Sequence, residues 1–282
     1  MNLALDVTYY VSAALYAIAA LFCFVYLRGT SDRPLSAARL VALTGAFGLL
    51  CVFGLRWIQW GLLPLTCVAD ALNFFVLLST FAIVAVVIVD RNAPLLSFAI
   101  PALAIVCLIN AGLAHHYLHD RPRDLPFFPL VSHVGSAFLA YSLFFLAGVT
   151  SAAYLFQARK LKQHDTAGLF QRLPSLEQLE RSLVRLIGYG YPLFVGTMAL
   201  GLIWAHVDGK LLQSTWWMSP KVVISFIMAA FYAVTFHKRR AGKLHGEKLA
   251  HRILLGFAAL LITYAVLGLA NVRTYHFWSA NL

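Results

Sequence analysis

The stretch "HVGSAFLAYSLFFLAGVTSAAYLF", residues 133–156, decides the fold class. After His133 it runs for 23 residues without a charged side chain. Roughly 20 apolar residues in a helix are enough to cross the ~30 Å hydrocarbon core of a bilayer. Lipid cannot satisfy an open backbone, and the alternating pattern of a barrel strand is missing. The stretch is therefore predicted to be a transmembrane helix with a histidine at its mouth.

Similar apolar segments recur along the whole chain. Hydrophobic residues make up 61% of the 282 residues, charged residues make up 12%, and the mean hydropathy is +0.78. These values lie outside the range of ordinary soluble domains. We predict an all-α polytopic membrane protein with eight transmembrane helices, in one transmembrane domain over residues 1–282. The expected spans are residues 8–27, 38–57, 66–89, 95–113, 131–156, 185–206, 219–236 and 252–272. The first has no basic start and no small-residue cleavage site, so it is expected to be a retained helix.

Positive charge alternates between the segments that connect these spans. Sixteen of the 22 lysines and arginines fall within about 28–39, 90–94, 157–185 and 237–252. Because cytoplasmic loops carry an excess of Lys and Arg, these segments are predicted to be cytosolic and both termini to face outward, on the periplasmic side. Anionic lipid at the inner leaflet also suits the net charge of +11. A nucleic-acid partner has no support, because the basic residues are divided among several short loops.

The longest hydrophilic segment contains "PSLEQLERSLVRL". Ser175 and Gln178 resemble a capping box, and leucines recur at helical spacing at Leu176, Leu179, Leu183 and Leu186. A short cytosolic amphipathic helix is predicted at about residues 174–186, running into the sixth span. The four cysteines lie in or beside apolar segments without C-x-x-C spacing, so a disulfide framework or a zinc site is not expected.

Tryptophan is confined to the predicted outer side, at Trp57, Trp60, Trp204, Trp216, Trp217 and Trp278. An interfacial belt would populate both membrane faces. An aromatic platform on the outer face is one interpretation of this distribution, and chance is the other.

Two histidines, His133 and His276, sit at the outer ends of the fifth and eighth spans. Axial ligation of a haem iron needs two imidazoles at similar depth on separate helices. Taken alone, however, the positions favour two ordinary polar residues at the membrane boundary. His237 closes the seventh span on the inner side. The run "HHYLH" at 115–119 has no acidic or cysteine partner at ligand spacing, so we interpret it as a polar loop.

Arg56 and Asp70 lie near the outer boundary on consecutive spans. Ionisable residues at this depth are costly and are usually paired. The two residues either form a structural bridge that closes the hairpin, or Arg56 faces an anionic ligand such as the propionates of haem.

Four segments, in order along the chain, resemble the CcsA proteins of system II cytochrome c biogenesis. "RWIQWGLLPLTCVADALNFF" (56–75) is similar to their R-W…G…P-L-S-N-x-Y-E-S-L-x-F stretch, with Asp70 in place of glutamate. "HVGSAFLAYSLFFLAG" (133–148) resembles H-V-S-x-x-x-L-S-Y-A. "SPKVVISFIMAAFYAVTFHKRR" (219–240) resembles D-P-K-E-T-W-x-F-I-T-W-x-x-Y-A-x-Y-L-H-x-R, and "LANVRTYHFW" (269–278) resembles V-N-L-L…G-L-H-S-Y. "LPSLEQLERSLVRL" (173–186) is similar to the HemX/YpjD branch of the same superfamily.

The resemblance implies roles for particular residues. His133 and His276 correspond to two external axial ligands of a b-type haem (heme b), and His237 to a histidine that meets haem within the membrane. Trp216 and Trp217, with Arg56 and Asp70, are expected to contact the cofactor. The tryptophan-rich loop W-G-x-Y-W-S-W-D-P-K of the family reads "GKLLQSTWWMSPK" (209–221) here, with Met218 and Ser219 replacing tryptophan and aspartate. This departure favours haem binding over covalent attachment of haem to apocytochrome c.

The implied function is haem handling in cytochrome c maturation, with binding rather than catalysis as the main chemistry. The protein is expected in the bacterial inner membrane, with the lipid bilayer, haem and other biogenesis subunits as partners. One alternative is a HemX-like regulatory or assembly protein of haem biosynthesis with little or no bound haem. Another is a b-type electron-transfer subunit, which would prefer two haems.

Overall fold

The computed structural model describes residues 2–65, 68–117, 126–164 and 172–269, and this part of the chain is helical without a strand. The predicted all-α class is confirmed. The eight long helices are α1 (Asn2–Arg28), α2 (Arg33–Trp60), α3 (Val68–Asp90), α4 (Leu96–Tyr117), α6 (Ser136–Lys162), α7 (Leu176–Val207), α9 (Pro220–Arg240) and α10 (Gly246–Leu269). The short elements are η1 (Ala93–Leu95), α5 (Phe127–Pro129), the π-helical turn η2 (Leu130–Gly135) and α8 (Ser214–Trp217).

Seven helical segments of the described chain are long and apolar enough to cross a membrane. They coincide with the first seven predicted spans, and the chain is a polytopic membrane protein. The helix α10, which corresponds to the eighth predicted span, is not among these seven.

The helix α7 is longer than the span predicted for it. The predicted span was 185–206, with a short amphipathic helix at about 174–186 before it, whereas α7 runs without a break from Leu176 to Val207. The predicted capping box is present: Ser175 Oγ accepts from the Gln178 backbone N–H at 3.2 Å, and Gln178 Oε1 accepts from the Ser175 N–H at 3.0 Å. This cap starts the helix before the apolar segment, so the predicted amphipathic helix and the predicted span form one continuous helix.

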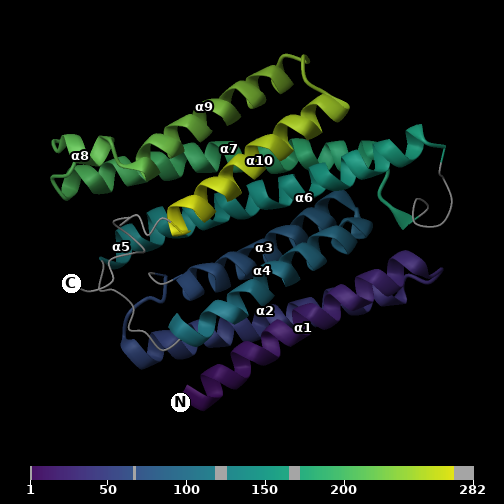
Figure 1. The fold of residues 1–282 in the computed structure, drawn as a ribbon, viewed down its shortest axis with the longest axis horizontal. Helices are drawn as coiled ribbons and strands as arrows, with labels where there is room; N and C mark the ends of the chain where they lie inside the picture. The colour runs from purple at the N-terminus through teal and green to yellow at the C-terminus, as the bar shows by residue number, and fades with distance from the viewer. Residues whose placement is uncertain (1, 66–67, 118–125, 165–171, 270–282) are drawn as a thin grey trace.

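The helices run side by side in two groups (Figure 1). One group is α1 to α4, and the other is α6, α7, α9 and α10. The helix α6 contacts α3, α7 and α10, so it lies at the centre of the bundle. Its buried face carries small residues, among them Ala140, Ala147, Gly148 and Ser151. Small side chains let membrane helices approach closely, and this composition gives α6 room for neighbours on several sides.

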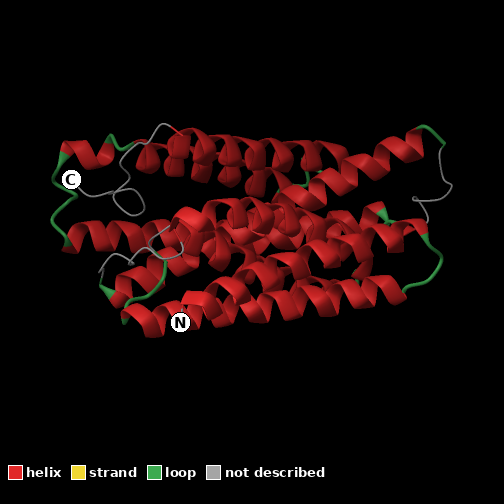
Figure 2. Cartoon of the chain, turned by 60° about the horizontal axis from the view of Figure 1, so that its bottom comes forward, coloured by secondary structure: helices red, strands yellow, loops and turns green. Residues whose placement is uncertain are grey.

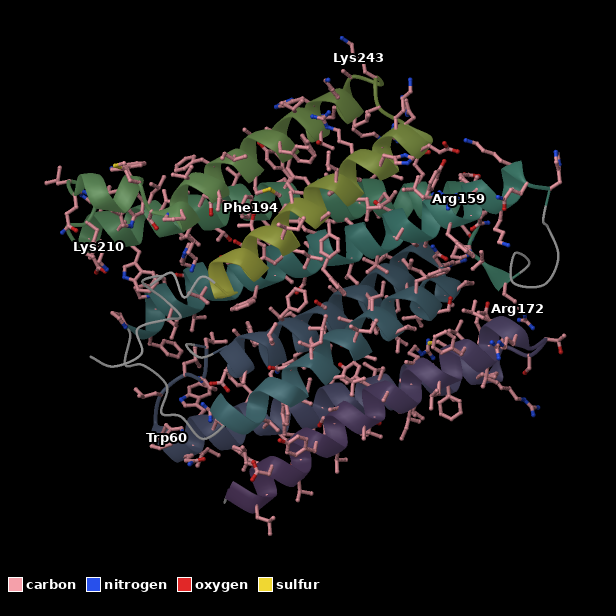
Figure 3. All side chains as sticks on the ribbon, in the orientation of Figure 1. Trp60, Arg159, Arg172, Phe194, Lys210 and Lys243 are labelled. Carbon is pink, nitrogen blue, oxygen red and sulfur yellow. The ribbon has the colours of Figure 1, made fainter. Side chains whose placement is uncertain are left out.

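The loops collect at the two ends of the bundle (Figure 2). Figure 3 shows Trp60 and Lys210 at one end and Arg159, Arg172 and Lys243 at the other. We call the first the tryptophan end, because α2, α7 and α8 bring Trp57, Trp60, Trp204, Trp216 and Trp217 there. We call the second the basic end. The predicted grouping of the connections onto two sides therefore agrees with the fold.

Ion pairs join the connections at the basic end. Arg185 pairs with Asp90, whose carboxylate also accepts from Ser182 Oγ at 2.7 Å, and this links α3 to α7. Lys162 and Glu247 lie 2.6 Å apart and link α6 to α10. Arg185 and Lys162 are thus tied to neighbouring helices.

Candidate functional site

A cavity of about 180 Å³ opens at the tryptophan end, between η2, α6, α7, α8 and α9. Its wall includes His133, Tyr141, Thr197, Trp204, Trp216 and Lys221. Two of the predicted site residues, His133 and Trp216, therefore meet at one cavity although they lie 83 positions apart in the sequence.

His133 belongs to the π-helical turn η2, which continues directly into α6. Such turns insert an extra residue into a helix and are frequent at functional sites. The half-buried His133 ring has its Nδ1 atom 2.9 Å from the Thr197 carbonyl oxygen on α7. A carbonyl oxygen only accepts, so Nδ1 carries the proton in this bond and Nε2 carries the lone pair of the neutral ring. The hydrogen bond to α7 thus determines that Nε2 is the ring nitrogen whose lone pair is able to bind a metal.

Aromatic rings form much of the surroundings of His133. The Trp204 ring meets the His133 ring edge to face, with centroids 6.0 Å apart and planes at 75°. Trp216 lines the cavity and packs edge to face against Trp217 at 4.8 Å. Trp217 itself is 44% exposed, donates from Nε1 to the Leu211 carbonyl at 2.8 Å and stacks on Phe226. Of the two tryptophans predicted to contact a cofactor, Trp216 reaches the cavity and Trp217 supports it from outside.

The cavity wall carries a net positive charge. Lys221 lies in the first turn of α9, and Lys210 lies in the loop before α8. Asp208 also lines the cavity and pairs with Lys210 at 2.7 Å, so the described wall holds two lysines and one aspartate. A ligand that carries carboxylate groups matches this charge.

Arg56 and Asp70 form a buried ion pair. Arg56 Nε lies 2.7 Å from Asp70 Oδ1, and Arg56 Nη2 donates to Asp70 Oδ2 at 2.8 Å. The Arg56 side chain is 0% exposed and that of Asp70 is 2% exposed. Neither residue belongs to the wall of the cavity. The structural bridge considered from the sequence is present, and it lies inside the protein rather than at a water boundary.

A small aromatic cluster connects this ion pair's helices with the cavity. Phe53 of α2 stacks on Phe74 of α3 at 5.6 Å, and Phe74 meets Phe138 of α6 edge to face at 5.8 Å. Phe138 also lines the cavity. The two groups of helices are therefore in contact through ring packing next to the site.

His237 is far from this cavity. It lies in the last turn of α9 with an exposed side chain, 16 residues after Lys221. At 1.5 Å per residue, the two positions are separated by about 24 Å along the helix axis. His276 and Trp278 lie outside the described residues. Within the described ranges, no group of three or more His, Cys, Asp or Glu residues could hold a metal ion.

The sequence interpretation missed three residues that surround His133, namely Ser136, Thr197 and Gly201. Thr197 contributes through its backbone, and Gly201 contributes by having no side chain. Neither property marks a residue in a single sequence. The one available signal is the spacing of Thr197 and Gly201, which puts them on one face of a helix, and this spacing is equally typical of ordinary packing positions.

Comparison with known proteins assigns the chain to a family. The family model described as "Cytochrome C assembly protein" matches residues 65–272, from just before α3 to beyond α10. Protein HemX of Bacillus subtilis (strain 168) is 31% identical over 150 residues, which cover 53% of this chain and 52% of the relative. Protein HemX of Brevibacillus brevis is 32% identical over 149 residues, covering 53% of each.

A longer match is found with the cytochrome c biogenesis protein CcsA of Guillardia theta, which is 26% identical over 238 residues and 76% of each chain. The matches to HemX span about half the length of those relatives. The predicted resemblance to the CcsA/HemX-like superfamily is confirmed. By its match over residues 65–272, the chain belongs to the cytochrome c assembly protein family.

Proposed function

We propose that this protein binds haem at the tryptophan end of its bundle and handles it during cytochrome c maturation. The family and the relatives named for cytochrome c biogenesis support the biological process. The observation that carries the proposal is the bond from His133 Nδ1–H to the Thr197 carbonyl at 2.9 Å, at the wall of an aromatic cavity. Metal-binding histidines almost always donate their other ring N–H to such an acceptor.

The chemistry of the cavity suits haem in three respects. His133 offers an imidazole Nε2, Trp204 and Trp216 offer apolar ring surface, and Lys221 offers a charge for a propionate. The volume of about 180 Å³ is below the roughly 300–1,000 Å³ of pockets that enclose a small molecule, so it suits a ligand that is only partly enclosed. A bound haem would supply an iron centre whose properties depend on its axial ligands.

The residues of this chain would then have separate tasks. His133 and, from outside the described residues, His276 would hold the haem b iron. Trp216 would pack against the porphyrin ring, with Trp217 supporting Trp216. Arg56 and Asp70 hold α2 against α3 beside the site, and the propionate contact of Arg56 stays a prediction. His237, 11 residues or about 16 Å along α9 beyond Phe226 of the cavity wall, has its task in the passage of haem through the membrane and not at this site.

The tryptophan end faces the periplasm in this proposal, and the membrane is the bacterial inner membrane. The excess of Lys and Arg at the basic end supports this orientation. We include α10 as the eighth span because its residues 253–269 carry no charge. With eight spans, both termini are on the periplasmic side.

A second candidate function is a haem-free regulatory or assembly protein. The matches to the two HemX proteins, 31% and 32% identical over 150 and 149 residues, favour it over that part of the chain. In that case the capped, charged start of α7 at the basic end would be the surface that meets a partner subunit.

The absorption spectrum of the purified protein tests the two candidates. We expect a haem Soret band with low-spin α and β bands in the wild type, because two imidazoles fill both axial positions. His133→Ala and His276→Ala should each remove the low-spin species, and added imidazole should restore part of it. His237→Ala should keep the spectrum of this site and lower its occupancy after expression in cells.

His206→Ala is the matched control, because His206 is exposed at the same end of the bundle and is not part of the cavity wall. It should keep the wild-type spectrum. A wild-type protein without haem supports the haem-free candidate. If both His133→Ala and His276→Ala keep the wild-type low-spin spectrum at full occupancy, the assignment of the ligands is wrong.

A further inference from the structure

The His133 ring lies directly against the backbone of α7. A Cβ atom built on Gly201 would be 2.6 Å from His133 Cε1, 3.1 Å from Nδ1 and 3.3 Å from Nε2. Real Cβ atoms essentially never come within 3.0 Å of another side chain. The position of the ring therefore depends on the absence of a side chain at Gly201.

Thr197 and Gly201 are four residues apart, so they lie on the same face of α7, one turn from each other. Thr197 supplies the carbonyl that accepts from Nδ1–H, and Gly201 supplies the space beside the ring. Together they form a seat for the His133 ring, in which Thr197 meets Nδ1 and Gly201 lies nearest to Cε1. Nε2 is then the ring nitrogen that carries the lone pair, since Nδ1 donates to Thr197.

Two hydroxyl groups tie the same seat to the turn that carries His133. Thr197 Oγ1 donates to Ser136 Oγ at 2.8 Å, and Ser136 Oγ in turn donates to the Ser132 carbonyl and, at 3.1 Å, to the His133 carbonyl. The side chain of Thr197 thus contacts η2 and α6, while its carbonyl contacts the imidazole. The ring of His133 and the turn that carries its backbone are thus both in contact with the same turn of α7.

We propose that Thr197 and Gly201 are positioning residues that select the Nε2 atom of His133 as the atom offered to a haem iron. This inference rests on the proposed function for the identity of the metal group, but the orientation of the ring is a property of the protein alone. A seat of this kind fixes the tautomer of the imidazole and the direction of its lone pair, which are what second-layer contacts control at metal sites.

The variant that tests the seat is Gly201→Ala, with Gly196→Ala as its matched control. Gly196 lies on the same helix five residues earlier, and a Cβ there would meet nothing within 4 Å. Both changes add one methyl group to α7, so any general effect on the helix is shared. The added methyl displaces the His133 ring in Gly201→Ala alone.

The first measurement uses haem-free protein in detergent. Diethyl pyrocarbonate modifies unprotonated imidazole nitrogens, and mass spectrometry of the peptide that contains His133 follows the rate. In Gly201→Ala the ring loses the hydrogen bond from Nδ1 that makes Nε2 more basic, so we expect His133 to react several-fold more slowly than in the wild type. Gly196→Ala should match the wild type, and the exposed His206 should react alike in all three. Equal rates for His133 in Gly201→Ala and the wild type would overturn the proposal.

The second measurement uses haem-loaded protein. Gly201→Ala should lower the affinity for haem by about 10–100-fold, the usual effect of removing a contact behind a metal ligand. Added imidazole should restore the low-spin spectrum, which a general folding defect would not allow. A wild type that binds no haem contradicts the proposed function alone, and the modification rates still decide the positioning role. Unchanged haem affinity in Gly201→Ala contradicts the positioning role alone.

If Gly201→Ala is not recovered in folded form, a pair of variants at His133 takes its place. The amide N–H of His133→Asn is able to donate to the Thr197 carbonyl, whereas His133→Leu has no donor. His133→Asn should melt at the wild-type temperature, and His133→Leu should melt lower. Equal melting temperatures for the two variants would contradict the role of the Thr197 carbonyl.

Discussion

At the scale of single residues, burial changes the expected contribution of the ion pair between Arg56 and Asp70 to stability. An ion pair at an exposed boundary contributes about 0–1 kcal/mol, and that value would favour a role in binding over a role in stability. The pair is instead 0% and 2% exposed and is joined by two contacts of 2.7 and 2.8 Å. Removal of one partner from such a pair leaves an uncompensated charge inside the protein.

We expect Arg56→Ala and Asp70→Ala each to lower the free energy of unfolding by about 3–5 kcal/mol. The double variant should lose less than the sum, because no lone charge remains. Unfolding in detergent, followed by circular dichroism, measures these differences. Arg181→Ala is the control, since its pair with Glu177 is exposed and should contribute about 0.3–0.5 kcal/mol.

The same variants test the propionate role predicted from the sequence. Haem retention is compared at equal amounts of folded protein. A loss of haem in Arg56→Ala that exceeds the loss in Asp70→Ala supports contact with a propionate. Equal retention in Arg56→Ala and the wild type removes that role.

At the scale of helices, the close approach of α6 and α10 depends on one glycine. A Cβ on Gly148 would lie 2.3 Å from Cδ1, 2.4 Å from Cγ and 3.0 Å from Cβ of Phe257. Contact with the Cβ atom as well as the ring means that rotation of the Phe257 side chain alone does not relieve the overlap. The close packing of α10 on the central helix α6 therefore requires a residue without a side chain at position 148.

We expect Gly148→Ala to lower the free energy of unfolding by about 1–3 kcal/mol through overpacking. Gly188→Ala on α7 is the matched control, because a Cβ there meets nothing within 4 Å. It should keep or slightly raise stability, since alanine favours a helix. Thermal unfolding in detergent compares the two variants. The packing explanation fails if Gly148→Ala melts with the wild type, or if Gly148→Ala combined with Phe257→Ala shows no recovery relative to Phe257→Ala alone.

At the scale of the whole molecule, the distribution of charge predicts its orientation. The connections at the basic end hold most of the Lys and Arg residues, and the loop before α8 lies at the opposite end (Figure 3). Cytoplasmic loops retain such residues. The tryptophan end and the cavity are therefore expected to face the periplasm.

Cysteine labelling in intact bacterial cells measures this orientation, in a background where the four native cysteines are replaced. Leu212→Cys, at a position 96% exposed in the loop at the tryptophan end, should react with a membrane-impermeant reagent. Lys243→Cys at the basic end should react only after permeabilisation. A cysteine added after Leu282 should behave like Leu212→Cys if α10 is a span. The reverse pattern for Leu212→Cys and Lys243→Cys would invert the proposed orientation.

Local properties of the sequence determined most of the fold. Whether a segment prefers a membrane helix depends on its own length and polarity, and seven of the predicted spans coincide with apolar helices of the structure. The cap at Ser175 was predictable for the same reason, because both of its partners lie within one turn. The sequence motifs also identified His133 and Trp216, which meet at one cavity.

Only the tertiary structure decided how the site is arranged. The contact of His133 with Thr197 uses a backbone carbonyl, which every residue has, and the contact with Gly201 uses an absent side chain, so neither has a sequence signature. The burial of Arg56 depends on neighbouring helices. The contacts of His133 with Thr197 and Gly201 join segments more than 60 residues apart, and they exist only once the helices have packed.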